Sequence, residues 1–389
     1  MPYYKKMGII PPKRHIIFPN KNNSYLNEGI YYEHVVTTQG FDRAYSVLYH
    51  LRPPTLTKSV ELVKEINIEP CDKQPLRHHH FLSAEMKKQG DPITGRVPLM
   101  YNQDLIAYRC NPLTKQETIF RNAAADEVIF IHHGSGIIKT HYGNLKYKDG
   151  DFVIMPRTTN YLIIPDDPQK DQYLILECNS IVEIPERYKN TDGQIMLGAP
   201  YYERDFHGPS ELQTIDQFTE TPVLVKEKNR LTKMNMANHP FDVVGWDGYL
   251  YPYIFNANDF EPLTGTVHLP PPAQQVFQCV GFVICAFVPR YLDHHPQAIK
   301  VPYAHSNVEA DEVLFYTRGQ FGSRKGVSSG SLTLHPGGIP HGPHPGTIQK
   351  SMDQDRTNEL AIMFDTDNKL QITKQAMQMD DPTYPLTWL

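Results

Sequence analysis

The stretch that decides the fold of this chain spans residues 303–344 and reads YAHSNVEADEVLFYTRGQFGSRKGVSSGSLTLHPGGIPHGPH. Its first half offers His305 and then Glu312, which leads at once into a short apolar run. Its second half alternates polar and apolar residues and reaches His341 through a turn rich in glycine and proline. Two imidazoles and one carboxylate at the edges of short strands cover one face of a metal and leave the opposite positions open, which suits Fe(II). We therefore expect these three side chains to bind a metal ion.

The spacing of these residues resembles the two sequence motifs of the cupin superfamily. Here the motifs read His305-x-Asn307-x4-Glu312-x6-Gly319 and Gly330-x5-Pro336-x-Gly338-x2-His341. The first has asparagine where many cupins have a second histidine, and the second matches in full. Glycine and proline turn the chain between short antiparallel strands, so that ligands distant in sequence meet at one point. The alternative is a jelly roll without metal, but buried and unpaired histidine and glutamate side chains are costly.

Composition favours an all-β protein outside the membrane. The 389 residues include 33 Pro, 24 Gly, 23 Tyr and 17 Phe, a mixture of turn-formers and strand-formers. A net charge of −5 offers no basic footprint for nucleic acid. The five cysteines contain no CxxC pair and are typical of reduced thiols. The N-terminal residues lack the apolar core of a signal peptide, and the most apolar run, residues 279–288, is too short to span a bilayer. We expect a cytoplasmic protein with no membrane segment.

An internal repeat links the two halves of the chain. Residues 126–130 (DEVIF) mirror residues 311–315 (DEVLF), and Gly150-x5-Pro156 mirrors Gly330-x5-Pro336. The ligand set is not repeated with them. The carboxylate has a counterpart in Glu127, but Phe120 or Arg121 replaces the first imidazole, depending on the gap, and Tyr161 replaces the second. One carboxylate does not hold a transition metal, so we expect the first roll to be structural.

These patterns predict an all-β double cupin, that is, two jelly-roll β-barrels of which the first is degenerate and the second binds metal. We expect an N-terminal domain over residues 1–220, with its roll at about 104–183 followed by a connector, and a C-terminal catalytic domain over residues 221–389. Residues 57–66 show some helical offset but are too short to decide, and we interpret them as a linking element or a strand.

Two groups of adjacent histidines lie outside the motifs. Neighbouring residues of a strand point to opposite faces, so at most two of His78, His79 and His80 can share an ion. We interpret them as polar residues at a strand edge or an oligomer contact rather than as ligands. His132 and His133 are interpreted as surface or interface residues.

Several words of the sequence, spread over nearly its whole length, resemble the homogentisate 1,2-dioxygenase family. They are IPPKRH (10–15), FDVVGWDGYLYPY (241–253), YAHSN (303–307), LHPGGIPHGP (334–343) and ELAIMFDT (359–366). The resemblance implies an Fe(II)-dependent enzyme that opens homogentisate with O2 to maleylacetoacetate in tyrosine and phenylalanine catabolism. It also implies a homo-oligomer, with trimers paired as hexamers.

The same resemblance assigns roles to further residues. It implies that His305, Glu312 and His341 bind the iron and that the catalytic His268 bonds a ring hydroxyl of the substrate. An imidazole is the side chain best suited to accept a proton at neutral pH. His335, Tyr303 and His341 are implied to contribute to substrate binding.

One departure from the family concerns the acetate arm of the substrate. Phe321 stands where related enzymes have a tyrosine that reaches the substrate carboxylate, and a missing hydroxyl there costs about 1–3 kcal/mol. Arg318, Tyr316 or a neighbouring subunit could supply the lost donor. Two alternatives therefore stay open: a related cupin dioxygenase for gentisate or hydroxyanthranilate, and a double-cupin binding or storage protein without turnover. The ligands alone do not separate iron from manganese.

Overall fold

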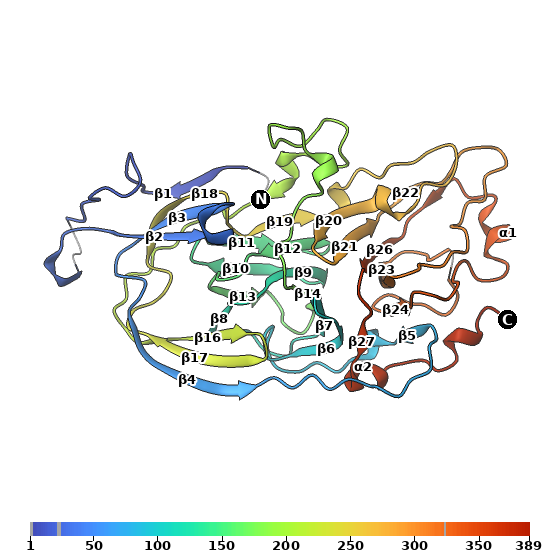
Figure 1. The fold of residues 1–389 in the computed structure, drawn as a ribbon, viewed down its shortest axis with the longest axis horizontal. Helices are drawn as coiled ribbons and strands as arrows, with labels where there is room; N and C mark the ends of the chain where they lie inside the picture. Colours follow the sequence, from blue (N-terminus) through green and yellow to red (C-terminus); the bar gives the residue numbers. More distant parts are fainter. Residues whose placement is uncertain (1–2, 22–24, 323) are drawn as a thin grey trace.

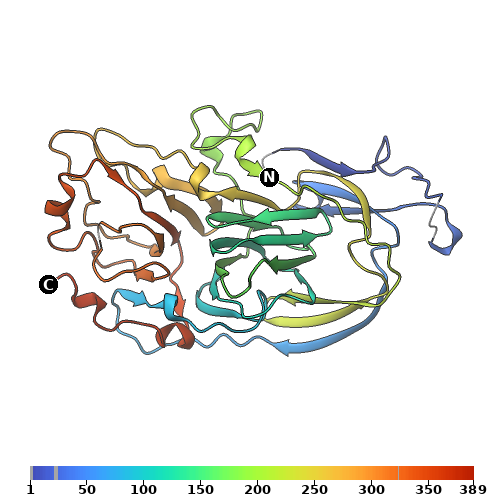
Figure 2. The same cartoon turned by 180° about the vertical axis from the view of Figure 1, so that it is seen from behind.

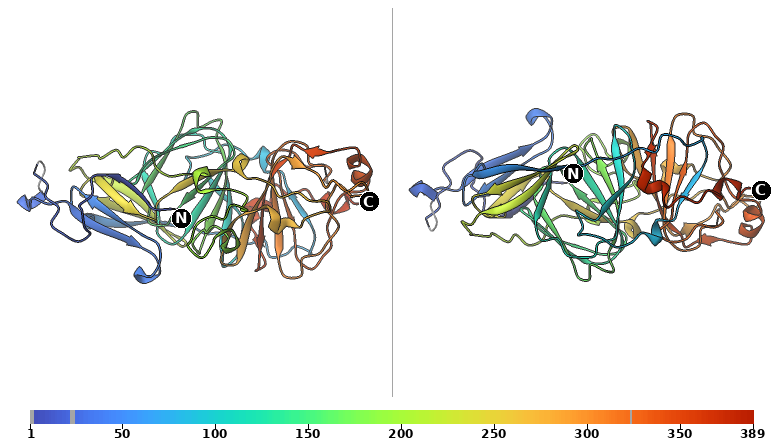
Figure 3. Two further views of the ribbon diagram at one scale, coloured as in Figure 1. Left: turned by 90° about the horizontal axis from the view of Figure 1, so that it is seen from above. Right: turned by 90° about the horizontal axis from the view of Figure 1, so that it is seen from below.

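The computed structural model describes residues 3–21, 25–322 and 324–389, and these are built almost wholly from β-strands. The molecule is elongated, with two β-rolls side by side along its long axis (Figures 1 and 3). This arrangement confirms the predicted all-β double cupin. The described residues contain only short helices: α1 (Thr347–Ser351), α2 (Lys374–Met377) and the 3-10 turns η1 (Tyr25–Asn27), η2 (Gln39–Phe41), η3 (Ser83–Glu85), η4 (Glu186–Tyr188), η5 (Glu203–Asp205), η6 (Ala257–Asp259), η7 (Pro271–Gln274) and η8 (Tyr384–Leu386). Among these residues we find no helix whose length and apolar character would let it span a lipid bilayer.

Two large sheets form the first roll. One holds, in spatial order, β11 (Gly143–Tyr147), β10 (Gly136–Thr140), β13 (Tyr161–Pro165), β8 (Ile119–Asn122), β16 (Thr221–Glu227), β17 (Arg230–Met236) and β4 (Thr57–Glu65). The other holds β15 (Phe206–His207), β19 (Tyr253–Asn256), β12 (Asp151–Met155), β9 (Asp126–His133), β14 (Gln172–Cys178), β7 (Leu105–Cys110), β6 (Arg96–Tyr101) and β27 (Gln371–Ile372). A separate four-stranded sheet lies at the N-terminal end and holds β1 (Lys5–Gly8), β18 (Val243–Gly248), β3 (Tyr45–His50) and β2 (Tyr32–Thr37).

The central strands of the second of these sheets are apolar on both faces. In β9, Val128 and Phe130 belong to the larger core, whereas Ile129 and Ile131 belong to a second core. Successive residues of a strand point to opposite faces, so β9 separates two buried layers. This explains why its sequence is a continuous apolar run rather than an alternating one.

The second roll is built on a six-stranded sheet. Its strands, in spatial order, are β20 (Gln275–Cys279), β21 (Phe282–Phe287), β26 (Leu360–Thr366), β23 (Asp311–Arg318), β24 (Leu332–His335) and β5 (His79–Phe81). Shorter pairings also belong to this half: β22 (Arg290–Tyr291) with β25 (Arg356–Thr357), and a single bridge between His305 and His341. The repeat is visible in the pairing, because β12 lies beside β9 as β24 lies beside β23.

One strand of the second roll comes from the N-terminal part of the chain. β5 pairs with β24, so that His79 lies opposite Leu334 and His80 opposite Thr333. In Figures 1 and 2 this light blue strand lies among the orange and red C-terminal segments. The edge position agrees with one of the two interpretations of the histidine triplet, but all three of its side chains are buried.

β4 settles the interpretation of residues 57–66 in favour of a strand. It forms the edge of the seven-stranded sheet and pairs with β17 over most of its length. All nine of its residues are exposed, including Val60 at 63% and Leu62 at 56%. The weak helical offset in its sequence was overridden by this pairing, which is a tertiary contact.

Strand pairing does not follow the predicted division at residue 221. Residues 221–256 supply β16, β17, β18 and β19, which hydrogen-bond to strands from residues 5–155. A single apolar core also joins the rolls: the Phe130 and Phe315 rings lie 6.3 Å apart, and Phe152 and Phe277 lie 5.7 Å apart. At the same contact His132 is buried, with its Nε2 3.1 Å from the Thr317 carbonyl oxygen. The division into domains stays a proposal, and we propose to draw it after residue 256.

Candidate metal centre

β23 begins with two adjacent acids that serve different purposes. Asp311 accepts hydrogen bonds from the backbone N–H groups of Gly337 (2.9 Å) and Leu370 (2.8 Å), and it pairs with Lys369 at 3.0 Å. It therefore fastens two loops to the strand. Glu312, as the next residue, points to the opposite face of the sheet. Its carboxylate is thus placed inside the roll by a strand whose start is fixed by its neighbour.

His305 and His341 lie side by side because their backbones pair. Each N–H donates to the other residue's carbonyl oxygen at 2.8 Å. The turn that precedes His341 is tied to the same place, since the N–H of Gly338 donates to the carbonyl of Asn307 at 2.7 Å. Gly338 has a φ of 93°, a backbone conformation that residues other than glycine rarely adopt. The glycine of the second motif is therefore a requirement of this turn.

The three predicted ligands converge on one point. The Nε2 of His341 lies 3.1 Å from Oε1 of Glu312, and the Nε2 of His305 lies 3.6 Å from Oε2. Each residue offers one donor atom that lies within 4.8 Å of the donor atoms of the other two. Among the described residues, this is the group of His, Cys, Asp and Glu side chains that is close enough to hold a metal ion.

The donor atoms also fit a metal in their hydrogen bonding. The Nδ1 of His341 is buried without a hydrogen-bond partner, and its Nε2 lies 3.1 Å from Oε1 of Glu312 without forming a hydrogen bond to it. A buried polar atom without a partner costs about 1–3 kcal/mol, and a bound cation would remove that cost by accepting a nitrogen lone pair. The three residues therefore fit the metal ion that the two sequence motifs imply.

Three imidazoles keep Glu312 in its charged form. Burial alone would raise the pKa of Glu312, but contacts with His305, His335 and His341 outweigh it and hold the pKa well below its usual range. His335 lies across from it on β24, with Nδ1 2.8 Å from Glu312 Oε1 and Nε2 3.2 Å from the Tyr384 hydroxyl. Burial lowers the pKa of His335 to about 3, so its ring is neutral near pH 7. A neutral ring donates one N–H, and that donor orients the carboxylate.

A cavity of about 530 Å³ opens onto this centre. Its described lining includes His268, Tyr303, His305 and Glu312, together with apolar side chains such as Leu269, Leu314, Phe321 and Met363. The structure thus brings four of the six predicted site residues to one cavity. His335 and His341 are buried beside Glu312 and are not among the described lining residues.

His268 is held by two neighbours at the cavity wall. Its Nδ1 lies 3.5 Å from Oδ2 of Asp293, and its ring meets that of Tyr303 edge to face at a centroid distance of 5.0 Å. Burial lowers the pKa of His268, although Asp293 acts in the opposite direction. The ring is therefore neutral near pH 7 and can accept a proton through Nε2. Asp293 was not predicted, because it lies in a loop with no motif of its own.

The structural role of the histidine triplet, residues 78–80, was also not predicted from the sequence. The Nε2 of His78 lies 3.1 Å from the carbonyl oxygen of Pro340, next to His341. His79 pairs with Asp380 at 3.1 Å. The triplet therefore braces the loop that carries the third candidate ligand and the C-terminal segment beside it.

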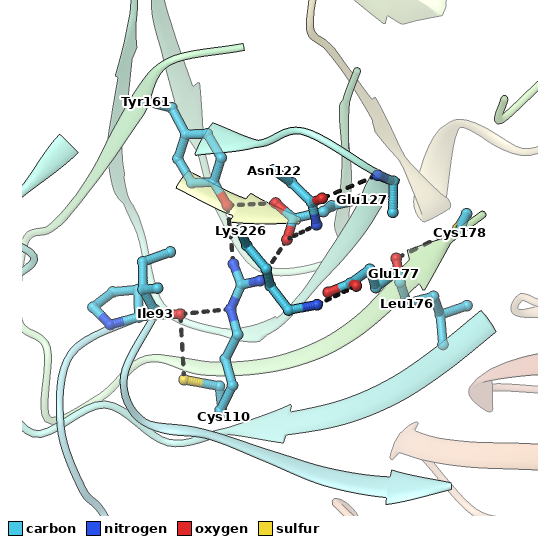
Figure 4. A network of polar contacts seen from close by, with 12 residues as sticks. Ile93, Cys110, Asn122, Glu127, Tyr161, Leu176, Glu177, Cys178 and Lys226 are labelled. Atoms are coloured by element: carbon cyan, nitrogen blue, oxygen red, sulfur yellow. Dashed lines mark hydrogen bonds and ion pairs between the residues drawn. The ribbon is translucent and has the colours of Figure 1, made fainter. Parts of the chain in front are cut away.

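The first roll has a different arrangement at the equivalent position. Glu127 is the second residue of β9, as Glu312 is of β23, and it receives hydrogen bonds from the Tyr161 hydroxyl and from the guanidinium of Arg96. Figure 4 shows Tyr161 pointing at Glu127, and beside them the pair of Lys226 and Glu177. The Arg96 guanidinium also reaches the Tyr161 oxygen at 3.0 Å. Protein cations thus balance the carboxylates of Glu127 and Glu177.

Replacing Arg96 by methionine is expected to destabilise the protein by about 3–5 kcal/mol, because removal of one partner leaves a buried carboxylate uncompensated. Equilibrium unfolding in urea measures the change. The control is Arg230→Met, which breaks an exposed pair with Glu227 (side chains 56% and 40% exposed) and should cost less than about 1 kcal/mol. Equal losses in both variants would show that the buried network carries no special weight.

Comparison with known proteins gives matches along most of the chain. The family descriptions "Homogentisate 1,2-dioxygenase N-terminal" and "Homogentisate 1,2-dioxygenase C-terminal" match residues 72–257 and 255–389. A protein of Saccharolobus solfataricus named "Putative dioxygenase" is 36% identical over 392 residues, which cover 100% of this chain and 99% of that protein. A homogentisate 1,2-dioxygenase of Bradyrhizobium diazoefficiens is 25% identical over 276 residues, which cover 66% of this chain and 59% of that protein.

Solved structures with some likeness include one that is named as a cupin. A cupin 2 conserved barrel domain protein from Leptotrichia buccalis has a TM-score of 0.36 and 9% identity, covering 80% of this chain and 100% of that one. Oxalate decarboxylase of Bacillus subtilis has a TM-score of 0.35 and 10% identity, covering 80% of this chain and 84% of that one.

Proposed function

The chain belongs to the homogentisate 1,2-dioxygenase family, and from this premise we propose that it opens the ring of homogentisate, with both atoms of O2 entering the product maleylacetoacetate. The observation that carries the proposal is the convergence of His305, Glu312 and His341 beside one cavity, whose described lining includes the first two. The cavity volume of about 530 Å³ lies in the range that holds a small organic ligand. Fe(II) is the metal that we propose for the centre.

The candidate ligand set suits a substrate that brings its own negative charge. Fe(II), when bound, supplies open positions for a ring hydroxyl and for O2. Glu312 contributes one negative charge, and His305 and His341 contribute none when neutral. The remaining positive charge favours an anionic substrate oxygen at the centre. This supports a phenolate in place of a neutral phenol.

His268 is the residue that we propose to accept the proton of the ring hydroxyl. It lines the same cavity as His305 and Glu312, and its neutral ring has a free lone pair to offer. Asp293, at 3.5 Å from Nδ1, holds the proton on that nitrogen and so leaves Nε2 as the acceptor. Tyr303 supports the ring from the side and lines the cavity itself. Apolar side chains of the lining, such as Leu269, Leu314 and Met363, offer contacts to the substrate ring.

A second candidate is a dioxygenase for an acid without the acetate arm, such as gentisate. Phe321 favours it, because its ring lies in the cavity lining and offers no hydrogen bond to a carboxylate. The neighbouring Tyr316 is buried, and its hydroxyl already shares a hydrogen bond with the Thr333 hydroxyl at 3.1 Å.

Oxygen uptake by anaerobically reconstituted Fe(II) protein separates these candidates. We expect kcat/KM to be highest for homogentisate, by at least about tenfold over gentisate and 3-hydroxyanthranilate, because remote contacts to the acid arm contribute to transition-state binding. A reversed order would favour the second candidate. If none of the three acids caused oxygen uptake, a binding protein without turnover would stand in place of the enzyme.

A further inference from the structure

Arg324 brings a positive charge to the cavity from the loop between β23 and β24. It lines the cavity together with Tyr316 and Phe321. Its Nη1 donates to the carbonyl oxygen of Gly342 at 2.6 Å, and Gly342 directly follows the candidate ligand His341. The guanidinium is therefore fixed next to the metal centre by the same loop that carries the third ligand.

Arg324 also interacts electrostatically with the candidate metal centre. Burial alone would lower the pKa of Arg324, but Tyr316, Tyr384 and Glu312 act in the opposite direction, and the pKa is raised. Arg324 and Glu312 are thus close enough to interact. A divalent cation at the centre would be bound by Glu312, whose single negative charge leaves a net positive charge there. The positive charge of the Arg324 guanidinium adds to this net charge.

The other positive groups among the described lining residues are bound to parts of the wall that carry none of the three candidate ligands. Arg290 pairs with Glu359 at 3.1 Å, and the ammonium of Lys300 donates to the carbonyl of Asp293. The guanidinium of Arg356 lies over the ring of Tyr291 at 4.7 Å. Arg324 differs from them because its partner, Gly342, lies in the loop that carries His341.

We propose that Arg324 recognises the carboxylate of an aromatic acid bound at the metal centre and so restricts the substrates to acids. The inference rests on the proposed function and deepens it. A planar guanidinium can grip a carboxylate with two parallel hydrogen bonds, which fixes the orientation of the ring as well as its charge. The family tyrosine lost at Phe321 would then have its replacement three residues further along the chain.

From the sequence, the group that donates a hydrogen bond to the substrate carboxylate in place of the missing tyrosine could be Arg318, Tyr316 or a neighbouring subunit. Arg318 is exposed and donates to the side chain of Asn258, and it is not among the described residues that line the cavity. The hydroxyl of Tyr316 lies 3.1 Å from that of Thr333 and has a single proton to donate, whereas a guanidinium has five N–H donors in a fixed plane. Geometry therefore favours Arg324 over both.

The test measures binding and does not depend on turnover. Fe(II)-loaded protein is titrated without oxygen in a calorimeter, once with homogentisate and once with its primary amide, which keeps both ring hydroxyls but has no charge. For the wild type we expect the acid to bind about 10- to 100-fold more tightly than the amide. Arg324→Gln should remove that preference and leave amide binding within about threefold. Arg324→Lys, which keeps the charge, should retain part of it.

Arg318→Gln is the matched control and should keep the full preference for the acid. Metal content and melting temperature of each variant confirm that the centre and the fold are intact. The proposal is overturned if the wild type binds the amide as tightly as the acid, or if Arg324→Gln weakens both ligands equally. A wild type that shows the preference but consumes no oxygen would sink the proposed function and leave the role of Arg324 standing.

Discussion

Replacing Glu312 by glutamine is expected to leave the protein without its metal and without measurable oxygen uptake. Glutamine has nearly the same shape, but it carries no charge, and Glu312 supplies the negative charge of the candidate ligand set. Groups that merely orient a ligand cost 10–100-fold in metal affinity when removed, so the loss of a ligand should exceed about 100-fold. Metal per chain is measured after anaerobic loading with Fe(II) and gel filtration, and turnover is measured with an oxygen electrode.

Glu309→Gln provides the control for this experiment. Glu309 is exposed and lies three residues before Glu312, in the loop that leads into β23, so it has the same charge but no place in the centre. That variant should hold as much iron as the wild type and consume oxygen at the same rate. If Glu312→Gln also held one iron per chain after gel filtration, the ligand set derived from the motif would be wrong.

Short-range spacing was sufficient to predict which three side chains, those of His305, Glu312 and His341, come together. The glycine of the second motif adopts a φ of 93° at Gly338, which ties its turn to the loop of His305. Such requirements are local, so they leave a trace in the sequence. The DEV triplets that begin β9 and β23 are visible for the same reason, because each places two adjacent acids on opposite faces at the start of a strand.

Features that depend on distant partners left no such trace. β5 has three residues and gains its meaning only by pairing with β24, about 250 positions further along the chain. β16 to β19 follow an irregular connector in sequence, yet they complete sheets of the first roll. Asp293 and Arg324 lie in loops, where a side chain's role depends on which wall the loop covers. A polar residue in a loop is by itself uninformative, so sequence reasoning could not select these two.

Replacing His268 by alanine is expected to lower kcat by about 10²- to 10⁴-fold while the iron content stays unchanged. His268 lines the cavity but is not one of the converging donors, so its removal should spare the metal. The rate falls because the other imidazole among the described lining residues, that of His305, is a candidate metal ligand and does not replace His268 as proton acceptor. His294→Ala is the control, since His294 is exposed, adjoins Asp293 and is not among the described lining residues.

The pH profile tests the same assignment independently of the size of the rate loss. Burial lowers the pKa of His268 below its usual value of 6.5, so the ring is neutral, and able to accept a proton, above that lowered pKa. The wild-type rate should therefore fall only as the pH drops below about 6.5, through the lowered pKa. The alanine variant should lose this acid limb. Asp293→Asn should keep the iron and reduce kcat less than His268→Ala, because it disturbs the tautomer and leaves the imidazole in place. Normal turnover by the alanine variant, or an unchanged acid limb, would show that the proton of the ring hydroxyl goes elsewhere.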